Sequence, residues 1–112
     1  METDDRRKHE RVPIAIVVRY ADHEEQVAVM SRDLSLGGLF LGTGTPAPAA
    51  ALLDLRLYLP APHGEVLAQG RVKHCLLGIG MGVEFSSFRG DGEGRLRNYL
   101  QAISKLEGLS QP

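Results

Sequence analysis

The sequence of 112 residues contains one cysteine, no tryptophan and few aromatic residues, and each scarcity excludes a class of protein. With Cys75 alone, no intrachain disulfide can form, so we expect a reducing compartment and a packed structural role for Cys75. Three phenylalanines and three tyrosines offer few platforms on which the bases of single-stranded RNA could stack. The formal net charge of −1 also lacks the basic excess expected of a protein that binds polymeric nucleic acid.

Long apolar runs, metal-ligand spacings and hydrolase motifs are absent from the sequence as well. No apolar run approaches the roughly 18 residues of a membrane span, and the METDD start is no signal peptide, so we expect a cytoplasmic protein without membrane insertion. The four histidines lack zinc-binding spacing, and no Walker loop occurs. Ser35 beside Asp33 lacks the sequence context of a hydrolase nucleophile. We therefore expect no metal, no cofactor and no enzyme activity.

Six short segments show the alternation of apolar and polar residues that predicts β-strands. Their ranges are 14–21, 27–32, 39–41, 53–59, 65–75 and 81–85. Glycine and proline mark the connections between them, and Gly70 inside the fifth segment predicts a bulge or bend. Regularly spaced short strands of this kind indicate an antiparallel barrel or sandwich.

From residue 91 the apolar pattern changes to the period of a helix. The apolar stripe consists of Leu96, Tyr99, Leu100, Ile103 and Leu106. The sequence predicts an N-cap at Asp91 and a helix end at Gly108. A chain of this length is expected to form one domain. We expect a flexible arm over residues 1–13, a β-domain over 14–107 that includes the helix at about 91–107, and a tail over 108–112.

Two polar motifs stand out because neither is needed to build a core. The first, Arg7–Arg11, places two arginines at RxxxR spacing, and the second, Asp33–Gly38, has the pattern DxSxxG. A guanidinium group matches phosphate oxygens or the O6/N7 edge of guanine with two parallel donors, and its flat face can stack on a purine. Asp33 can accept the N–H donors of guanine, Ser35 can donate to a phosphate or base, and Gly38 permits unusual backbone geometry or close approach. The combination suits an anionic ligand with guanine-like edges.

These two motifs, in this order and at this distance, resemble the PilZ domain, a family of bacterial receptors for cyclic di-GMP. The resemblance extends from about Arg6 to Leu106 and includes Val12-Pro13, Gly38–Leu41 and Gly80–Phe85. It implies a mainly all-β fold, a six-stranded antiparallel β-barrel with a C-terminal α-helix. The implied ligand-binding residues are Arg7, Arg11, Asp33, Ser35 and Gly38, with Arg6 as an accessory charge.

Three functions are compatible with the sequence, two of them within the PilZ family. The first is a stand-alone receptor that binds cyclic di-GMP through both motifs and transmits the signal to a protein partner in motility, biofilm or exopolysaccharide control. The alternative is a PilZ-like adaptor that binds a protein partner without nucleotide. The third, an RNA-binding barrel, is disfavoured by the scarce aromatic residues and the negative charge. The motifs could also be only a solvated basic tail followed by a turn.

Overall fold

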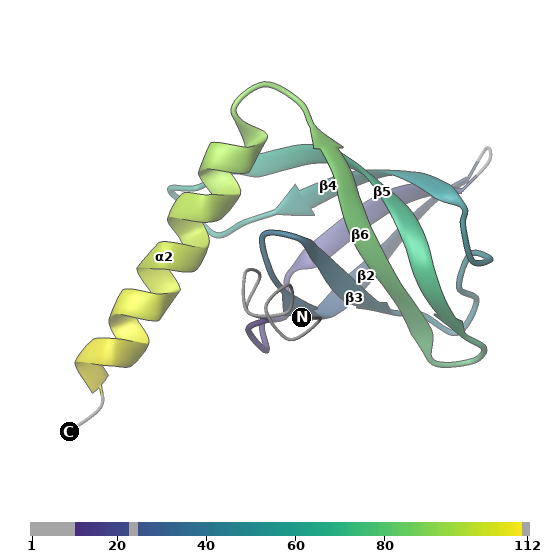
Figure 1. Ribbon diagram of the computed structural model, residues 1–112, viewed down its shortest axis with the longest axis horizontal. Coiled ribbons are helices and arrows are strands. Elements are labelled where there is room, and N and C mark those ends of the chain that lie inside the picture. The colour runs from purple at the N-terminus through teal and green to yellow at the C-terminus, as the bar shows by residue number, and fades with distance from the viewer. Residues whose placement is uncertain (1–10, 23–24, 111–112) are drawn as a thin grey trace, which may run out of the picture.

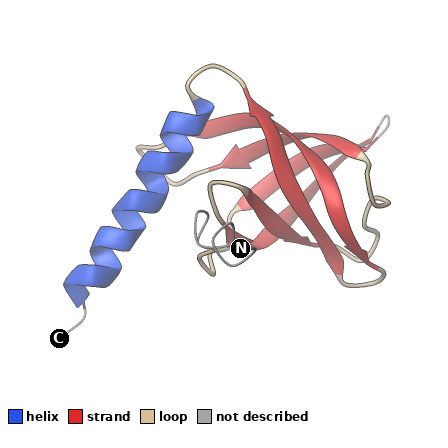
Figure 2. Cartoon of the chain, in the orientation of Figure 1, coloured by secondary structure: helices blue, strands red, loops and turns tan. Residues whose placement is uncertain are grey.

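The computed structural model describes residues 11–22 and 25–110, which form a closed barrel and one helix (Figure 1). The elements are β1 (Val17–Asp22), β2 (Glu25–Leu34), β3 (Gly38–Gly42), β4 (Leu52–Tyr58), β5 (Glu65–Leu76), β6 (Gly80–Phe88) and α2 (Gly92–Ser110). Neighbouring strands are antiparallel and follow the order β1-β2-β3-β6-β5-β4 around the barrel. Figure 2 shows the strands of the barrel in red and the helix in blue. The six-stranded antiparallel barrel with a C-terminal helix is thus confirmed. Across these described residues, no helix has both the length and the apolar character needed to cross a membrane.

The core of the barrel follows from the alternation of side chains along each strand. On β4, Leu53, Leu55 and Leu57 are buried while the residues between them are exposed, because successive side chains of a strand point to opposite faces. Strand β1 contributes the buried Tyr20 in the same way. Cys75 on β5 is partly buried against this core, which confirms its predicted role as a packed residue.

The first strand begins at Val17 rather than at Ile14 as predicted. A side chain of β2 accounts for the difference. The Ser31 hydroxyl donates to the Ile14 carbonyl oxygen at 2.7 Å and accepts the Ile16 N–H at 3.0 Å. The Ile14 carbonyl oxygen and the Ile16 N–H therefore bond a buried hydroxyl instead of the backbone of a neighbouring strand, and the strand begins after them. Ile16, Val18 and Tyr20 are buried, so alternate residues of the predicted segment still lie on the inner face of the barrel.

The irregularity predicted at Gly70 is present, but the extra residue is on the partner strand. Gln69 lies opposite Ser87 and Gly70 opposite Phe85, so Ser86 of β6 is the unpaired residue of this bulge. A Cβ atom at Gly70 would lie 2.5 Å from a methyl carbon of Val83 and 3.0 Å from one of Leu55, so no side chain fits there. Strand β6 continues to Phe88, beyond its predicted end. The β5–β6 hairpin is therefore longer than the sequence pattern indicated.

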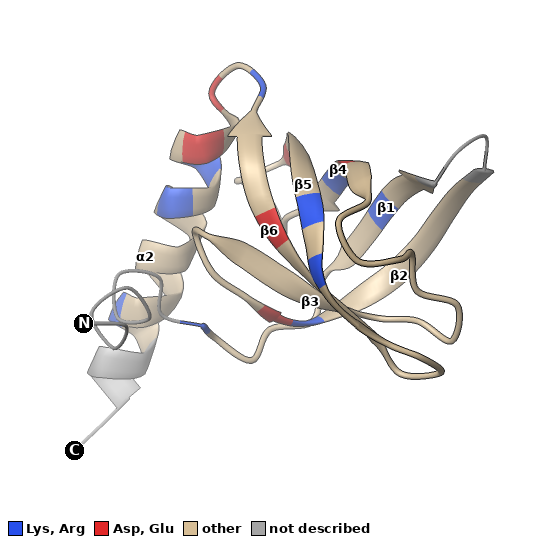
Figure 3. Ribbon diagram, turned by 45° about the vertical axis from the view of Figure 1, so that its right-hand side comes forward, with Lys and Arg blue, Asp and Glu red and all other residues tan. Residues whose placement is uncertain are grey.

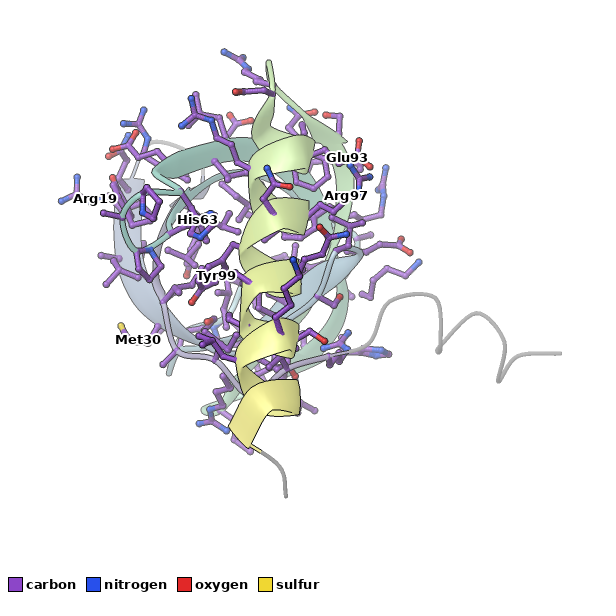
Figure 4. All side chains as sticks on the ribbon, turned by 90° about the vertical axis from the view of Figure 1, so that its left-hand side faces the viewer. Arg19, Met30, His63, Glu93, Arg97 and Tyr99 are labelled. Carbon is purple, nitrogen blue, oxygen red and sulfur yellow. The ribbon has the colours of Figure 1, made fainter. Side chains whose placement is uncertain are left out.

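Helix α2 lies across one open end of the barrel (Figure 4). Its predicted apolar stripe is confirmed for Leu96 and Tyr99, which are buried, and for Leu100 and Ile103, which are partly buried against the core. The prediction is wrong for Leu106, which is 66% exposed. The first half of the helix therefore closes the barrel, while Leu106 lies beyond the surface that the barrel covers.

The two ends of α2 differ in how well the sequence predicted them. Asp91 precedes the helix, and its carbonyl oxygen accepts the Arg95 N–H at 3.0 Å, as expected at an N-cap position. The Asp91 carboxylate pairs with Arg95 Nε at 3.0 Å, and Arg95 also donates to the His63 carbonyl oxygen at 3.4 Å. The helix continues to Ser110, so the ends predicted at residue 107 and at Gly108 are wrong. A glycine costs a helix about 1 kcal/mol but does not by itself terminate it.

Candidate functional site

The DxSxxG motif begins at a bulge in β2 that turns two consecutive side chains outward. The pairing of β2 with β3 shifts between Ser31, which is opposite Leu41, and Asp33, which is opposite Phe40. Arg32 is the extra residue, and an extra residue interrupts the alternation of the two faces. Ser31 is buried, whereas Arg32 is exposed and Asp33 is partly exposed. Two side chains of opposite charge therefore lie next to each other on the outside of the barrel.

Arg11 and Asp33, far apart in sequence, form an ion pair at this bulge. Arg11 Nη1 lies 3.0 Å from Asp33 Oδ1 and 3.2 Å from Oδ2. Immediately beside them, Val12 and Leu34 form an antiparallel bridge with two backbone hydrogen bonds of 2.9 Å. Asp33 Oδ1 also accepts the Phe40 N–H at 3.0 Å. The last residue of the RxxxR motif is thus held against the first residue of DxSxxG.

Residues 11–13 belong to the edge of the barrel, not to the flexible arm that was predicted over residues 1–13. Val12 pairs with β2, and its carbonyl oxygen accepts the Ile14 N–H at 2.8 Å. Pro13, in the middle of this tight turn, has the fixed φ that such a turn favours. Arg6 and Arg7, the other basic residues predicted for the site, lie outside the described residues.

Ser35 is buried, at 2% exposure, and its hydroxyl is fully engaged inside the loop. The hydroxyl donates to the Gly38 carbonyl oxygen and accepts the N–H groups of Gly37 and Gly38, all at 3.1 Å. The Ser35 N–H also donates to the Gly38 carbonyl oxygen at 2.8 Å. One donor and two acceptor sites are the full capacity of a hydroxyl. The side chain therefore fixes the shape of the loop between β2 and β3.

Gly38 is required by a close approach of two backbones. It lies opposite Glu84 where β3 pairs with β6, and a Cβ atom on Gly38 would overlap the Val83 carbonyl oxygen. The neighbouring Gly37 carbonyl oxygen accepts the Phe85 N–H at 2.9 Å. Glycine is therefore the residue that allows the loop to pack directly against β6.

The surface at the bulge combines two guanidinium groups with one carboxylate. The side chain of Arg11 is 52% exposed and that of Asp33 is 27% exposed. Asp33 Oδ2 accepts only from Arg11 among the described residues, so it retains acceptor capacity. The Arg32 guanidinium lies 5.6 Å from the centroid of the Phe40 ring, within the range of a cation–π contact. Arg32 was not predicted as a neighbour of this site, because in the sequence it occupies an ordinary strand position.

Other chemistries have little support in the part of the chain that the structure describes. Within it, no group of three histidine, cysteine or acidic residues is placed to hold a metal ion. His63 packs its ring at 5.2 Å from the ring of Tyr99. Burial raises the pKa of Tyr99 above its usual value. Basic and acidic positions are interspersed over the barrel in the view of Figure 3, rather than gathered by sign. The bulge of β2, where Arg11 of the first motif contacts Asp33 of the second, is thus the candidate site.

Solved structures of similar fold include three bacterial proteins. The chain matches MotI/DgrA, an inhibitor of motility from Bacillus subtilis, at 19% identity with a TM-score of 0.77 over 95% of this chain and 53% of that protein. It matches MrkH of K. pneumonia, solved in complex with c-di-GMP, at 25% identity and a TM-score of 0.76 over 96% of this chain and 55% of MrkH. The PilZ domain of YcgR from Escherichia coli, also solved with c-di-GMP, has 14% identity and a TM-score of 0.62 over 94% of each chain.

The chain thus spans about half the length of MotI/DgrA and MrkH and nearly the whole of the YcgR domain. A comparison with curated proteins gives no match. The family model of the PilZ domain matches residues 5–102, a region that contains both motifs and all six strands. This protein therefore belongs to the PilZ domain family.

Proposed function

We propose that this chain is a receptor that binds cyclic di-GMP at the bulge of β2 and transmits the signal to a protein partner. The observation that carries the proposal is the ion pair of Arg11 with Asp33, which brings the two motifs together on the outside of the barrel. Two of the similar structures, MrkH and the YcgR domain, are complexes with c-di-GMP, which supports the same ligand here. The proposed receptor has no catalytic role.

Arg11 and Asp33 would make direct contacts with the dinucleotide. Arg11 uses one guanidinium nitrogen for Asp33, so its remaining N–H donors are available for a phosphate or for the O6/N7 edge of guanine. The free acceptor capacity of Asp33 Oδ2 suits the N1–H and N2–H donors of guanine. Arg7 is four residues from Arg11, so its Cα lies within about 14 Å of the Arg11 Cα. That reach is sufficient for both arginines to contact one dinucleotide, with Arg6 as an accessory charge.

Ser35 and Gly38 would contribute through the loop that they hold in shape. A direct bond from the Ser35 hydroxyl to the ligand would require one of its three hydrogen bonds within the loop to open. Gly38 lies against β6, where its missing side chain lets the loop pack. We therefore assign ligand contact first to Arg7, Arg11 and Asp33, and positioning of the loop to Ser35 and Gly38.

Binding would exchange one partner of Arg11 for another. A solvent-exposed ion pair contributes only about 0–1 kcal/mol, so moving the guanidinium from Asp33 to a phosphate costs little. A micromolar dissociation constant corresponds to about −8 kcal/mol, which charge-assisted hydrogen bonds and stacking on guanine can supply. The segment before Val12 would then be fixed against the barrel by the ligand. A partner protein that binds only this arrangement would respond to cyclic di-GMP.

Isothermal titration of the purified protein with cyclic di-GMP tests this proposal, with GTP and cyclic di-AMP as ligand controls. We expect saturable binding of cyclic di-GMP alone. Arg11→Ala should abolish the heat of binding. Arg19→Ala should preserve the heat of binding, because Arg19 is an exposed arginine of β1 that lies over the ring of Tyr58 and takes no part in the proposed site. Absence of binding to folded protein would contradict the receptor proposal and favour the adaptor that acts without nucleotide. Equal losses in both variants would show a general effect of charge.

A further inference from the structure

Exposed aliphatic side chains occur at neighbouring positions of β1, β2 and the β5–β6 hairpin. Seven large hydrophobic residues of the described chain are exposed, and five of them belong to this group. We call the group the hairpin patch; it consists of Val17, Met30, Leu76, Leu77 and Ile79. A cluster of exposed apolar side chains is a candidate site of interaction with another molecule.

The members of the hairpin patch are connected through strand pairing. Val17 lies directly opposite Met30 where β1 pairs with β2. Met30 and Ile79 line the same hollow, which has a volume of about 410 Å³. The Ile79 carbonyl oxygen accepts the Thr43 N–H at 3.0 Å, which fixes the tip of the β5–β6 hairpin beside the end of β3. Leu76 and Leu77 continue the patch along the same hairpin.

Glycines make the hollow between these side chains. Gly42, Gly44 and Gly78 line it, and a Cβ atom added at Gly44 or Gly78 would meet no atom within 4 Å. Gly78 has a φ of +76°, which closes the hairpin turn. The hollow is therefore open space beside apolar side chains, wide enough to receive a side chain from another molecule.

Leu77 has no role in the core that would explain its identity. It is 84% exposed, at a hairpin turn where polar residues are usual. Covering an exposed leucine contributes about 1.5–3 kcal/mol, so a surface that presents Leu77 gains affinity for an apolar partner. The position is therefore better explained by contact with another molecule than by folding of this one.

Arg32 is the charged residue that lines the hollow. A partner that fills the hollow with an apolar side chain would therefore gain from a carboxylate placed near this guanidinium. A second copy of the chain fits less well, because a twofold dimer pairs the patch with itself, and neither the patch nor the lining of the hollow contains a carboxylate for Arg32. The charge of the hollow thus distinguishes between a foreign partner and self-association.

We propose that the hairpin patch binds a segment of a partner protein in which an aliphatic residue enters the hollow and a nearby aspartate or glutamate pairs with Arg32. The patch adjoins the candidate ligand site, since Arg32 and Asp33 are neighbours on the outside of β2. It does not include Arg11 or Asp33, so the proposal stands whether or not the chain binds cyclic di-GMP. The surface would serve equally in the receptor and in the adaptor that acts without nucleotide.

Selection from a random peptide display library on the full chain, without nucleotide, tests this surface. We expect enrichment of peptides that carry a leucine, isoleucine, methionine or phenylalanine within four residues of an acidic residue. The best peptide, synthesised with a fluorophore, is then titrated by anisotropy. Leu77→Ser should weaken its binding about tenfold or more, because one buried leucine is lost. Leu106→Ser, which changes an exposed leucine on α2, should change the affinity less than about twofold.

The acidic residue of the peptide is tested against Arg32 in a double-mutant cycle. Arg32→Ala should weaken the selected peptide but have little effect on the same peptide with its acidic residue replaced by alanine. Failure to enrich any such motif, or equal binding to the Leu77→Ser variant, would overturn the proposal. A dimer in sedimentation that Leu77→Ser dissociates would assign the patch to a second copy. Flotation with anionic lipid vesicles that Leu77→Ser abolishes would assign it to a membrane surface.

Discussion

Replacing Ser35 by alanine should lower the free energy of unfolding by about 2 kcal/mol, even without ligand. The hydroxyl is buried and makes three hydrogen bonds within the loop. The Gly38 carbonyl oxygen would keep its bond from the Ser35 N–H, and the partly buried Gly37 N–H could turn to water. The buried Gly38 N–H would lose its partner, which costs about 1–3 kcal/mol. A loss of about 2 kcal/mol exceeds the effect of an ordinary surface substitution.

Urea denaturation followed by far-ultraviolet circular dichroism measures this loss, since the chain has no tryptophan for fluorescence. We expect a lower midpoint at an unchanged slope and a melting temperature reduced by about 10 °C. Ser86→Ala is the matched control, because the Ser86 hydroxyl makes one exposed bond, to the Gln69 carbonyl oxygen at 3.1 Å. It should cost less than about 0.5 kcal/mol. If Ser35→Ala is as stable as Ser86→Ala but fails to bind cyclic di-GMP, Ser35 acts by ligand contact and our assignment is wrong.

Three further predictions concern single residues. Gly38→Ala should destabilise the fold by more than about 2 kcal/mol in thermal melts, because the new Cβ would overlap a carbonyl oxygen of β6. Gly94→Ala, in open space on α2, should instead stabilise the fold by up to about 1 kcal/mol. Equal melting temperatures of the two variants would refute the overlap. Arg11→Lys should weaken the binding of cyclic di-GMP at least about tenfold in calorimetry, because an ammonium cannot offer the two parallel donors of a guanidinium, and it should change stability little. Arg19→Lys should leave the binding of cyclic di-GMP unchanged. Burial raises the pKa of Tyr99, so the free energy of unfolding should fall as the pH rises above 10.0. Urea denaturation at pH 9 and pH 11 should show a smaller fall for Tyr99→Phe than for the unchanged protein. An equal fall in both would contradict this prediction.

The strands could be predicted because burial on one face leaves a period-two pattern in the sequence. Leu53, Leu55 and Leu57 show this most plainly, since each lies inside the barrel and the intervening residues do not. The position of the irregularity at Gly70 could also be predicted, because a glycine within a strand often marks a bulge or a close approach; that its extra residue is Ser86 of β6 could not. For the site, the order of the motifs predicted that they act together, and the structure places Arg11, the described arginine of the first motif, against the second.

Features that depend on the partner strand or on the size of the barrel could not be read from local pattern. The bulge at Arg32 has no glycine or proline to mark it, and it is defined only by the pairing of β2 with β3. Ser31 occupies an inward position because it bonds the backbone of a distant segment, which alternation does not reveal. Leu106 continues the helical stripe in sequence, but the barrel end has already been covered by the preceding turns of α2.

A titration followed by nitrogen-15 NMR tests most directly whether cyclic di-GMP binds where RxxxR meets DxSxxG. We expect saturable shifts of the Arg11 Nε–H signal and of the backbone amides from Asp33 to Gly38, with none caused by cyclic di-AMP at the same concentration. Saturable binding with shifts confined to other strands would contradict the assigned site. Unchanged spectra at about 100 µM cyclic di-GMP would contradict the receptor itself, because even a weak specific ligand would occupy the protein at that concentration.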